Sequence, residues 1–300
     1  MEFLSYLITG ISLGSIYAII ALGYTMVYGI IGLINFAHGE IYMLGAFTAL
    51  IVAGILGGIG LPWWGILVIA ALVAMVWCSA YGYTVEKVAY KPLRGASRLA
   101  PLISAIGMST FLQNYVQLAQ TSNSVPFPRL IPRRFSFLQD MGNFMAPGDF
   151  IMLVTSLLIM VALALFIRYT KMGKAMRATA QNRKMAMLLG IDADRIISLT
   201  FIIGSALAAL GGTLIAARTG QVGFAIGFLA GMKAFTAAVL GGIGSIPGAM
   251  LGGLVLGLAE GFTAGYFSSD YEDVLAFALL VLILIFRPAG LLGRAAIQKV

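Results

Sequence analysis

Polar and ionisable side chains that interrupt long apolar stretches are the residues of this sequence best suited to chemistry. Asn35, His38 and Glu40 fall within six residues, between two apolar stretches that no polar loop separates. An ionised side chain near the centre of a bilayer costs about 2.5–3.5 kcal/mol on insertion scales, so such residues usually face a cavity or a partner. The cluster predicts either a broken helix that lines a solute path or a tight, solvated turn at the membrane surface. We favour the turn for His38, whereas Glu40 fits both interpretations.

A second pair of charges lies further along the chain, in two other apolar stretches. Lys233 stands in FLAGMKAFTAAVL and Glu260 in GLVLGLAEGFTAG. A lysine can extend its ammonium to the membrane surface along its own apolar stem, and the two charges can also pair across neighbouring helices. We therefore favour a structural ion pair over a role in a solute path. Between them, glycines and a proline in residues 241–248 predict a chain reversal, either as a cytoplasmic hairpin or as a re-entrant turn.

The longest polar segment runs from Lys171 to Arg195 and holds six of the 19 Lys and Arg residues. Within it, Met185 to Leu189 is a short apolar run closed by Gly190, a residue suited to the left-handed position after a helix. Asp192 can then cap the next helix by accepting backbone N–H bonds. The segment predicts a short helix, a glycine break and a new membrane helix. Two interpretations stay open: an element that transmits force to a partner, and a solvated basic loop that fixes topology.

The sequence lacks the side-chain sets that enzymes and metalloproteins need. One Cys, Cys78, and one His exclude the common zinc sites and leave a nucleophilic triad without its usual partners. No glycine-rich loop ends in Lys-Ser or Lys-Thr, the pattern of a phosphate-binding loop. We therefore predict no catalytic residues, no metal, no cofactor and no ATP hydrolysis by this chain. Energy for active transport would come from a partner or from an ion gradient.

The composition indicates the kind of protein structure that holds these charged side chains in place. The chain is 60% hydrophobic and only 10% charged, whereas charged residues make up about a quarter of a soluble domain. The 37 glycines suit closely packed membrane helices. The net charge of +8 is divided among loops without interleaved aromatic residues, which favours contact with anionic lipid over nucleic acid. The fold class predicted is an all-α, polytopic integral membrane protein with one domain over residues 1–300.

Apolar runs of membrane length recur along the whole chain. About 20 apolar residues cross a bilayer as a helix, and most of the runs reach that length. The first run is long enough to be broken and the seventh is short, so we expect eight or nine spans with some interrupted helices. The runs cover residues 3–30, 36–57, 62–85, 100–120, 149–169, 196–218, 228–242, 248–266 and 272–287.

The positions of Lys and Arg predict the orientation of these spans. With nine spans, residues 86–99, residues 168–196 and the C-terminal tail fall on one side and carry 14 of the 19 basic residues. That side is therefore expected to be cytoplasmic, with the N-terminus outside. Residues 121–148 are then external although they contain Arg129, Arg133 and Arg134. Four prolines in this loop favour an extended, ordered surface loop over a helix.

Four long stretches carry a family resemblance that spans nearly the whole chain. Their sequence and order are similar to those of the permease subunit of bacterial high-affinity branched-chain amino-acid ABC importers, the Liv-type permease family. Related permeases serve urea and short amides, so the resemblance is less specific for the solute. The stretches are Gly23–Phe47, Leu102–Val116, Arg177–Asp192 and Gly231–Gly253.

The resemblance implies an ABC importer permease fold in the bacterial inner membrane. It implies a second, homologous permease subunit, two cytoplasmic ATP-binding subunits and a periplasmic amino-acid-binding protein that delivers leucine, isoleucine or valine. Transport would follow alternating access, coupled to ATP hydrolysis by the partners. Two other functions stay open: a permease of this family for urea or short amides, and an ion-coupled secondary transporter that uses His38, Glu40, Lys233 and Glu260 as a relay.

The resemblance also assigns roles to residues. Residues 171–195 become the loop whose helix docks into an ATPase, and Ala178-Thr179-Ala180 with Gly190 match the family's Glu-Ala-Ala and glycine pattern only in part. Arg129, Arg133 and Arg134 become candidates for docking the binding protein, while Asn35, His38, Glu40, Lys233 and Glu260 are candidates for the solute path. The candidates for ATPase coupling are Arg177, Ala178, Thr179, Ala180, Gln181, Asn182, Arg183, Met185, Leu189 and Gly190.

Overall fold

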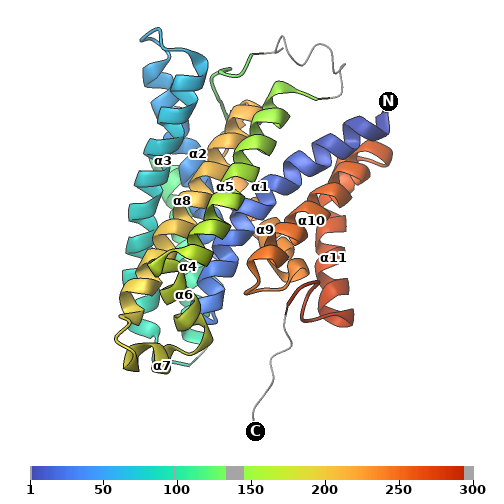
Figure 1. Cartoon of the computed structure of the whole chain (residues 1–300). Coiled ribbons are helices and arrows are strands. Elements are labelled where there is room, and N and C mark those ends of the chain that lie inside the picture. The colour runs from blue at the N-terminus through green and yellow to red at the C-terminus, as the bar shows by residue number, and fades with distance from the viewer. Residues whose placement is uncertain (1, 98, 133–144, 294–300) are drawn as a thin grey trace.

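The computed structural model describes residues 2–97, 99–132 and 145–293, and long helices fill most of this part of the chain (Figure 1). Within these residues a helix lies at each of the nine apolar runs, so the positions of the elements are as expected. The helices are α1 (Glu2–Ile31), α2 (His38–Leu56), α3 (Trp63–Val85), α4 (Leu99–Ala119), α5 (Pro147–Tyr169), α8 (Ala193–Thr219), α9 (Ile226–Gly241), α10 (Ile246–Tyr266) and α11 (Glu272–Phe286).

Six segments of the described chain are both long and apolar enough to cross a membrane: α1, α2, α3 extended to Leu93, α5, α8 and α10. The other three helices at predicted spans, α4, α9 and α11, do not meet both criteria. The all-α membrane class is confirmed, and the number of eight or nine spans stays a prediction. One detail of the prediction is wrong: the first run is a single continuous helix of 30 residues and is not broken.

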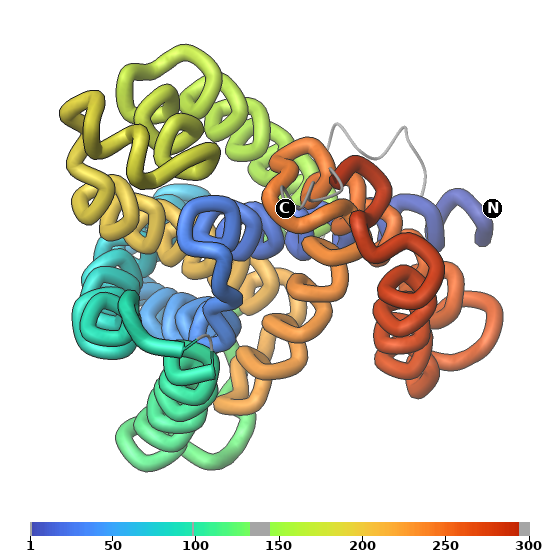
Figure 2. Tube along the Cα trace, turned by 90° about the horizontal axis from the view of Figure 1, so that it is seen from below, coloured from blue at the N-terminus to red at the C-terminus, as the bar shows by residue number. Residues whose placement is uncertain are grey.

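Glycines bring α1 and α10 into close contact. A Cβ atom added at Gly14 would lie 2.7 Å from the carbonyl oxygen of Gly253, and one added at Gly10 would lie 2.9 Å from that of Gly257. The two backbones thus approach to a distance that only glycine allows, the packing mode typical of membrane helices. Seen from below, α1 and α10 lie side by side, with α9 beside α10 (Figure 2).

Helix α8 lies at the centre of a second group of closely packed helices. It packs against α1, α2 and α3, and most of its length is buried. Its buried surface is rich in small residues such as Gly204, Ser205 and Ala208, so the neighbouring helices pack closely around it. A movement of α8 would therefore be transmitted to three other membrane helices, because packed interiors shift as units.

The two ends of the bundle carry different short elements. At the end that holds the N-terminus, β1 (Val125–Pro126) pairs antiparallel with β2 (Gln221–Val222) and joins the loop after α4 to the loop after α8. The opposite end carries α6 (Lys171–Gln181) and α7 (Arg183–Leu188) (Figure 1). Helix α3 continues there as η1 (Glu86–Tyr90) and η2 (Lys91–Leu93). The basic segment and the N-terminus thus lie at opposite ends, as the charge distribution predicts.

Candidate functional site

The α6–α7 segment, residues 171–190, is fixed by a hydrogen bond from a side chain at the start of each helix. The Thr170 hydroxyl accepts from the backbone N–H of Gly173 at 3.0 Å, and the Asn182 side chain accepts from that of Met185 at 3.0 Å. Such caps satisfy backbone donors that a helix leaves free. Asn182 both ends α6 and starts α7. The two short helices therefore meet at a defined angle.

The end of α7 has the predicted glycine break. Gly190 adopts a left-handed backbone with φ of +81°, and the N–H of Ile191 reaches back to the carbonyl oxygen of Ala186 at 3.0 Å. The Asp192 carboxylate then accepts from the N–H groups of Asp194 and Arg195, each at 3.1 Å. The predicted sequence of short helix, glycine break and Asp192-capped membrane helix is confirmed.

Helix α7 presents an apolar surface outside the membrane bundle. Met185, Leu188 and Leu189 are 57%, 81% and 77% exposed, while Ala186 is buried against the rest of the protein. An apolar patch on a polar, basic segment is typical of a surface that binds another protein. Met185 and Leu189 were in the predicted coupling set, and Leu188 was not.

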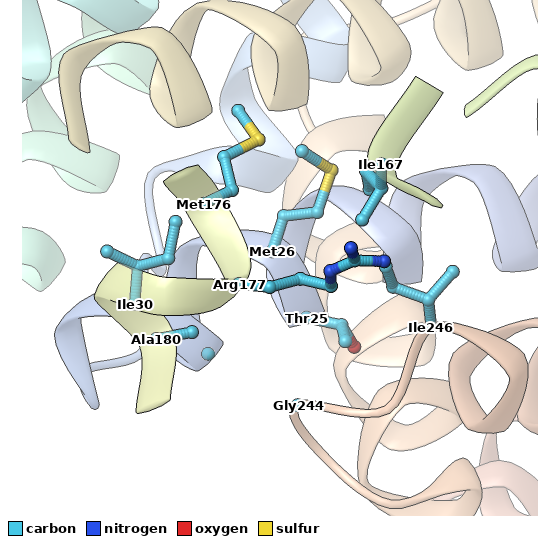
Figure 3. Close-up of a pocket in the computed structure, with 10 residues that line it drawn as sticks. Thr25, Met26, Ile30, Ile167, Met176, Arg177, Ala180, Gly244 and Ile246 are labelled. Atoms are coloured by element: carbon cyan, nitrogen blue, oxygen red, sulfur yellow. The ribbon is translucent and has the colours of Figure 1, made fainter. Parts of the chain in front are cut away.

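Helix α6 lies against the lower ends of the membrane helices. In Figure 3, Arg177 extends across a small cavity of about 90 Å³ whose walls include Met26 of α1, Ile167 of α5, and Gly244 and Ile246 at the start of α10. The predicted chain break in residues 241–248 is therefore real, because α9 ends at Gly241 and α10 begins at Ile246. Helix α6 packs against α1, α5 and α8, so a displacement of α6 would act on these helices.

The remaining predicted coupling residues in α6 differ in exposure. Thr179 is buried, and its hydroxyl donates to the carbonyl oxygen of Ala175 at 2.8 Å. Ala178 is half-buried, whereas Ala180 and Gln181 are exposed. Thr179 thus serves the packing of α6, and the exposed residues are the ones available to a partner.

A chain of ion pairs connects α7 to the membrane helices, and most of its members were not predicted. Arg183 of α7 contacts the Asp194 carboxylate at 2.9 Å, and Arg94 contacts the same oxygen at 2.6 Å. Arg94 also pairs with Glu86, which is fully buried. The Ser198 hydroxyl donates to the second oxygen of Glu86 at 2.9 Å. One sequence signal was available, since Glu86 follows directly on an apolar span and such a charge needs a partner.

His38 lies deeper in the protein than predicted. The link between α1 and α2 turns back into the bundle, so that the His38 ring packs edge-on against Tyr24 with 4.7 Å between ring centroids. His38 is 1% exposed, and Gly23 leaves the space that its imidazole fills. The expectation of a solvated turn is therefore wrong for this residue. The cause is the link itself, which is only six residues long and largely apolar.

Asn35, in the same link, does not cap α2. The residue at the cap position is Ala37, whose side chain makes no capping bond. The Asn35 side-chain oxygen instead accepts from the Tyr90 hydroxyl at 3.1 Å. Asn35 thus fastens the link to the end of α3.

Glu40 is buried beside a cavity between α4 and α9. Its carboxylate accepts from the Ser109 hydroxyl at 3.1 Å, and the residue is 1% exposed. Ser109 also lines the cavity, which has a volume of about 140 Å³. Thr110 and Gln113 add polar groups on the same helix, while apolar walls come from other elements: Phe36, Phe228 and Met232.

Lys233 and Glu260 form the predicted ion pair, with 3.2 Å between Nζ and Oε1. Two further residues join them: Asp273 contacts Lys233 at 2.7 Å, and the Tyr17 hydroxyl donates to Glu260 at 2.7 Å. The cluster, Tyr17, Lys233, Glu260 and Asp273, connects α1, α9, α10 and α11. The sequence predicted the pair but not these additional partners.

Arg129, the one predicted docking arginine that the structure describes, is exposed near the N-terminal end of the molecule. It lines a cavity of about 580 Å³ together with Arg218, which pairs with Asp149 at 2.6 Å. Arg133 and Arg134 lie outside the described residues. Of the three predicted docking arginines, the described residues therefore test the position of Arg129, which is exposed at this end.

A family model described as the permease component of the branched-chain amino acid transport system matches residues 6–284. The chain belongs to this permease family. Figures 1 to 3 thus show a transport permease.

Curated relatives match the permease over its full length. BraD of Pseudomonas aeruginosa, a high-affinity branched-chain amino acid transport system permease protein, is 52% identical over 302 residues, which are 100% of this chain and 98% of the relative. LivH of Escherichia coli K12, with the same description, is 51% identical over 303 residues at the same coverage. A solved metal-chelate type ABC transporter in an inward-facing conformation is 17% identical with a TM-score of 0.49, covering 95% of this chain and 86% of that one.

Proposed function

We propose that this permease imports branched-chain amino acids, leucine, isoleucine and valine, across the bacterial inner membrane. The observation that carries the proposal is the identity of 51–52% over the whole chain with permeases named for high-affinity transport of these amino acids. The permease provides the membrane passage, and ATP is hydrolysed by separate subunits.

The α7 helix is the proposed contact with an ATPase subunit. Its exposed Met185, Leu188 and Leu189 offer an apolar surface of the kind that a helix presents to a hydrophobic groove. The caps at Asn182 and Asp192 hold that surface in one orientation. The partners are two ATP-binding subunits, a second homologous permease and a periplasmic binding protein, with Arg129 facing the last of these.

The contacts of the α6–α7 segment with the membrane helices suit a mechanism of alternating access. A movement of the docked ATPase pair displaces this segment as a unit, since its helices are capped and short. Helix α6 packs against α1, α5 and α8, and so passes the displacement to the membrane bundle. The bundle then moves between two packed arrangements instead of deforming continuously.

The cavity beside Glu40 is the proposed lining of the solute path. Its walls combine the hydroxyls of Ser109 and Thr110 with apolar side chains, and Ser109 donates to the buried Glu40 carboxylate. An amino acid with an ammonium group and a branched aliphatic side chain has matching chemistry. The cavity opens between α4 and α9, where a second permease can complete it.

Uptake by the assembled transporter tests the proposal. Cells without branched-chain amino-acid uptake, supplied with this permease and its partner subunits, are expected to accumulate labelled leucine, with unlabelled isoleucine and valine as competitors. Uptake should survive collapse of the ion gradients and stop on depletion of ATP. Competition by urea or short amides, and not by isoleucine or valine, would show that the permease carries a different class of solute. Uptake that follows the ion gradient would contradict the ATP-driven mechanism.

A further inference from the structure

Four charged residues form a continuous chain from the α7 helix to the interior of the protein. They are Arg183 in α7, Asp194 in the first turn of α8, Arg94 after η2, and Glu86 at the end of α3, and we refer to them as the inner ion-pair chain. The pairs of Asp194 with Arg183 and with Arg94 join separate helical elements, whereas Glu86 lies eight residues before Arg94 on the continuation of α3. The chain thus connects the exposed α7 helix with α8 and α3.

The two outer residues of the chain are partly exposed, and the two inner residues are much less so. The side chains of Arg183 and Asp194 are 38% and 44% exposed, whereas those of Arg94 and Glu86 are 10% and 0% exposed. Outer members of the chain are weak as isolated pairs, because water competes with them. The inner pair is different, since a buried carboxylate needs charged and hydrogen-bonding partners to be stable. Ser198 and the nearby Lys87, at 3.6 Å, complete the surroundings of Glu86.

Arg94 occupies the junction of the chain. One of its terminal nitrogens contacts Asp194 and the other contacts Glu86. A guanidinium group presents donors in a fixed planar arrangement, so two carboxylates bound to it are held at a fixed separation. A change in the separation of the two carboxylates would therefore break one of the two contacts of Arg94. Helices α3 and α8 are therefore tied together at the end nearest to α7.

Arg183 is the matching connection on α7. Helix α7 contains two basic residues, Arg183 and the adjacent Lys184. Arg183 reaches Asp194, whereas Lys184 is exposed and makes no ion pair within the described residues. The two residues carry the same charge on the same short helix and differ in this contact. Lys184 is therefore a matched control for Arg183.

We infer that Arg94 is a positioning residue for transport, which makes α7 move together with the adjoining ends of α3 and α8. The inference rests on the proposed function, because it takes α7 to be the contact with the ATPase. In the intact permease, a displacement of α7 pulls on Asp194 through Arg183, and Arg94 passes it on to Glu86. Both long helices then respond to the same event. Neither Glu86 nor Arg94 needs to touch the ATPase or the solute.

The number of leucine molecules transported per ATP hydrolysed tests the inference. It is measured with the complete transporter in proteoliposomes for the parent, Glu86→Gln and Arg94→Met. The variants are expected to bind the ATPase subunits and hydrolyse ATP. The amount of leucine that they move per ATP should fall by a factor of roughly three or more, the scale of losses along a coupled network. Arg183→Gln should behave in the same way, and Lys184→Gln should retain the ratio of the parent.

A double variant separates positioning from folding. Removing one member of a buried ion pair leaves the other uncompensated, whereas replacing both is often tolerated. Glu86→Gln combined with Arg94→Met is therefore expected to recover the thermal stability that Arg94→Met loses. The ratio of leucine to ATP should stay low, because the bridge is still missing. A double variant with recovered stability and a recovered ratio would overturn the inference and leave the chain a purely structural contact.

The parent transporter separates this inference from the proposed function. A parent complex that fails to transport leucine, or that lacks bound ATPase subunits, contradicts the proposed function. A parent complex that works, together with unchanged ratios in Glu86→Gln, Arg94→Met and Arg183→Gln, contradicts only the inference. Equal losses in Arg183→Gln and Lys184→Gln would mean that the charge of α7 matters and the contact with Asp194 does not.

Discussion

Two charge clusters hold this permease together, and they differ in what they connect. The inner ion-pair chain links a short helix outside the bundle to α3 and α8, and its outer members are partly exposed. The cluster of Tyr17, Lys233, Glu260 and Asp273 also has a partly exposed member, Asp273, but it links only helices of the bundle and includes no residue of the α6–α7 segment. A contact that transmits movement must include the element that a partner displaces. A contact that fixes a bundle joins only the bundle helices.

The largest effect is expected from breaking the second cluster. Lys233→Met leaves the buried Glu260 with the Tyr17 hydroxyl as its partner among the described contacts. Loss of one member of a buried ion pair costs roughly 3–5 kcal/mol. The thermal midpoint of the purified permease should therefore fall strongly, and the double variant Lys233→Met/Glu260→Gln should recover most of it.

The same variants sharpen the comparison between the clusters. Where the double variant assembles, the amount of leucine moved per ATP should equal that of the parent, unlike in variants of the inner chain. A reduced ratio at full stability would show that the Lys233 cluster contributes to transport as well.

A smaller effect is expected at the end of α7. Gly190 has a φ of +81°, a conformation that costs an L-residue with a side chain about 1–2 kcal/mol. Gly190→Val should therefore distort the α7 helix and weaken the stimulation of ATP hydrolysis by loaded binding protein. Gly190→Asn is the matched control, since asparagine tolerates this backbone. Full stimulation by Gly190→Val in a normally assembled complex would contradict the role of α7.

These capped helices show how much the sequence can specify. Gly190 and Asp192 interact with backbone groups a few residues away, so their roles could be predicted from the local sequence. The partners of Arg94, Asp194 and Glu86 depend on which helices lie side by side, and no local pattern contains that. Asp273 and Tyr17 were missed for the same reason.

His38 shows a different kind of error. The depth of a short link depends on whether it leaves the bundle or turns back into it, and His38 was placed at the surface on its position in sequence alone. The run from Ile30 to Ala37 is almost wholly apolar, which is the signal that would have favoured a buried link. Roles of Asn35, His38 and Glu40 in the path stay predictions.

A further variant tests the solute path. Glu40→Gln keeps the shape of the side chain and removes its negative charge. In the proposed path, that charge attracts the ammonium group of an amino acid in the cavity beside Ser109. Leucine uptake is expected to fall roughly tenfold, the scale of one charge-assisted hydrogen bond. Ser109→Ala, which keeps the carboxylate, should have a smaller effect. Uptake equal to that of the parent in Glu40→Gln would make Glu40 a structural residue.

The smallest effect is expected at the end opposite to α7. Arg129→Glu reverses one exposed charge and should weaken binding of the periplasmic protein about 2- to 5-fold at low ionic strength, the scale of an exposed ion pair. Salt should remove the difference, because exposed charges are screened. Titration of binding protein into proteoliposomes at two salt concentrations measures it. An unchanged affinity at low salt would exclude Arg129 from the docking surface.

Crosslinking from Leu188 tests the central claim most directly, because this residue is 81% exposed on α7. A photoreactive amino acid at position 188 in the complete transporter is expected to crosslink to an ATPase subunit, while the same group at Leu118, exposed on α4, should not. Crosslinks from position 188 to the periplasmic binding protein, or labelling of that position from outside sealed cells, would contradict the account.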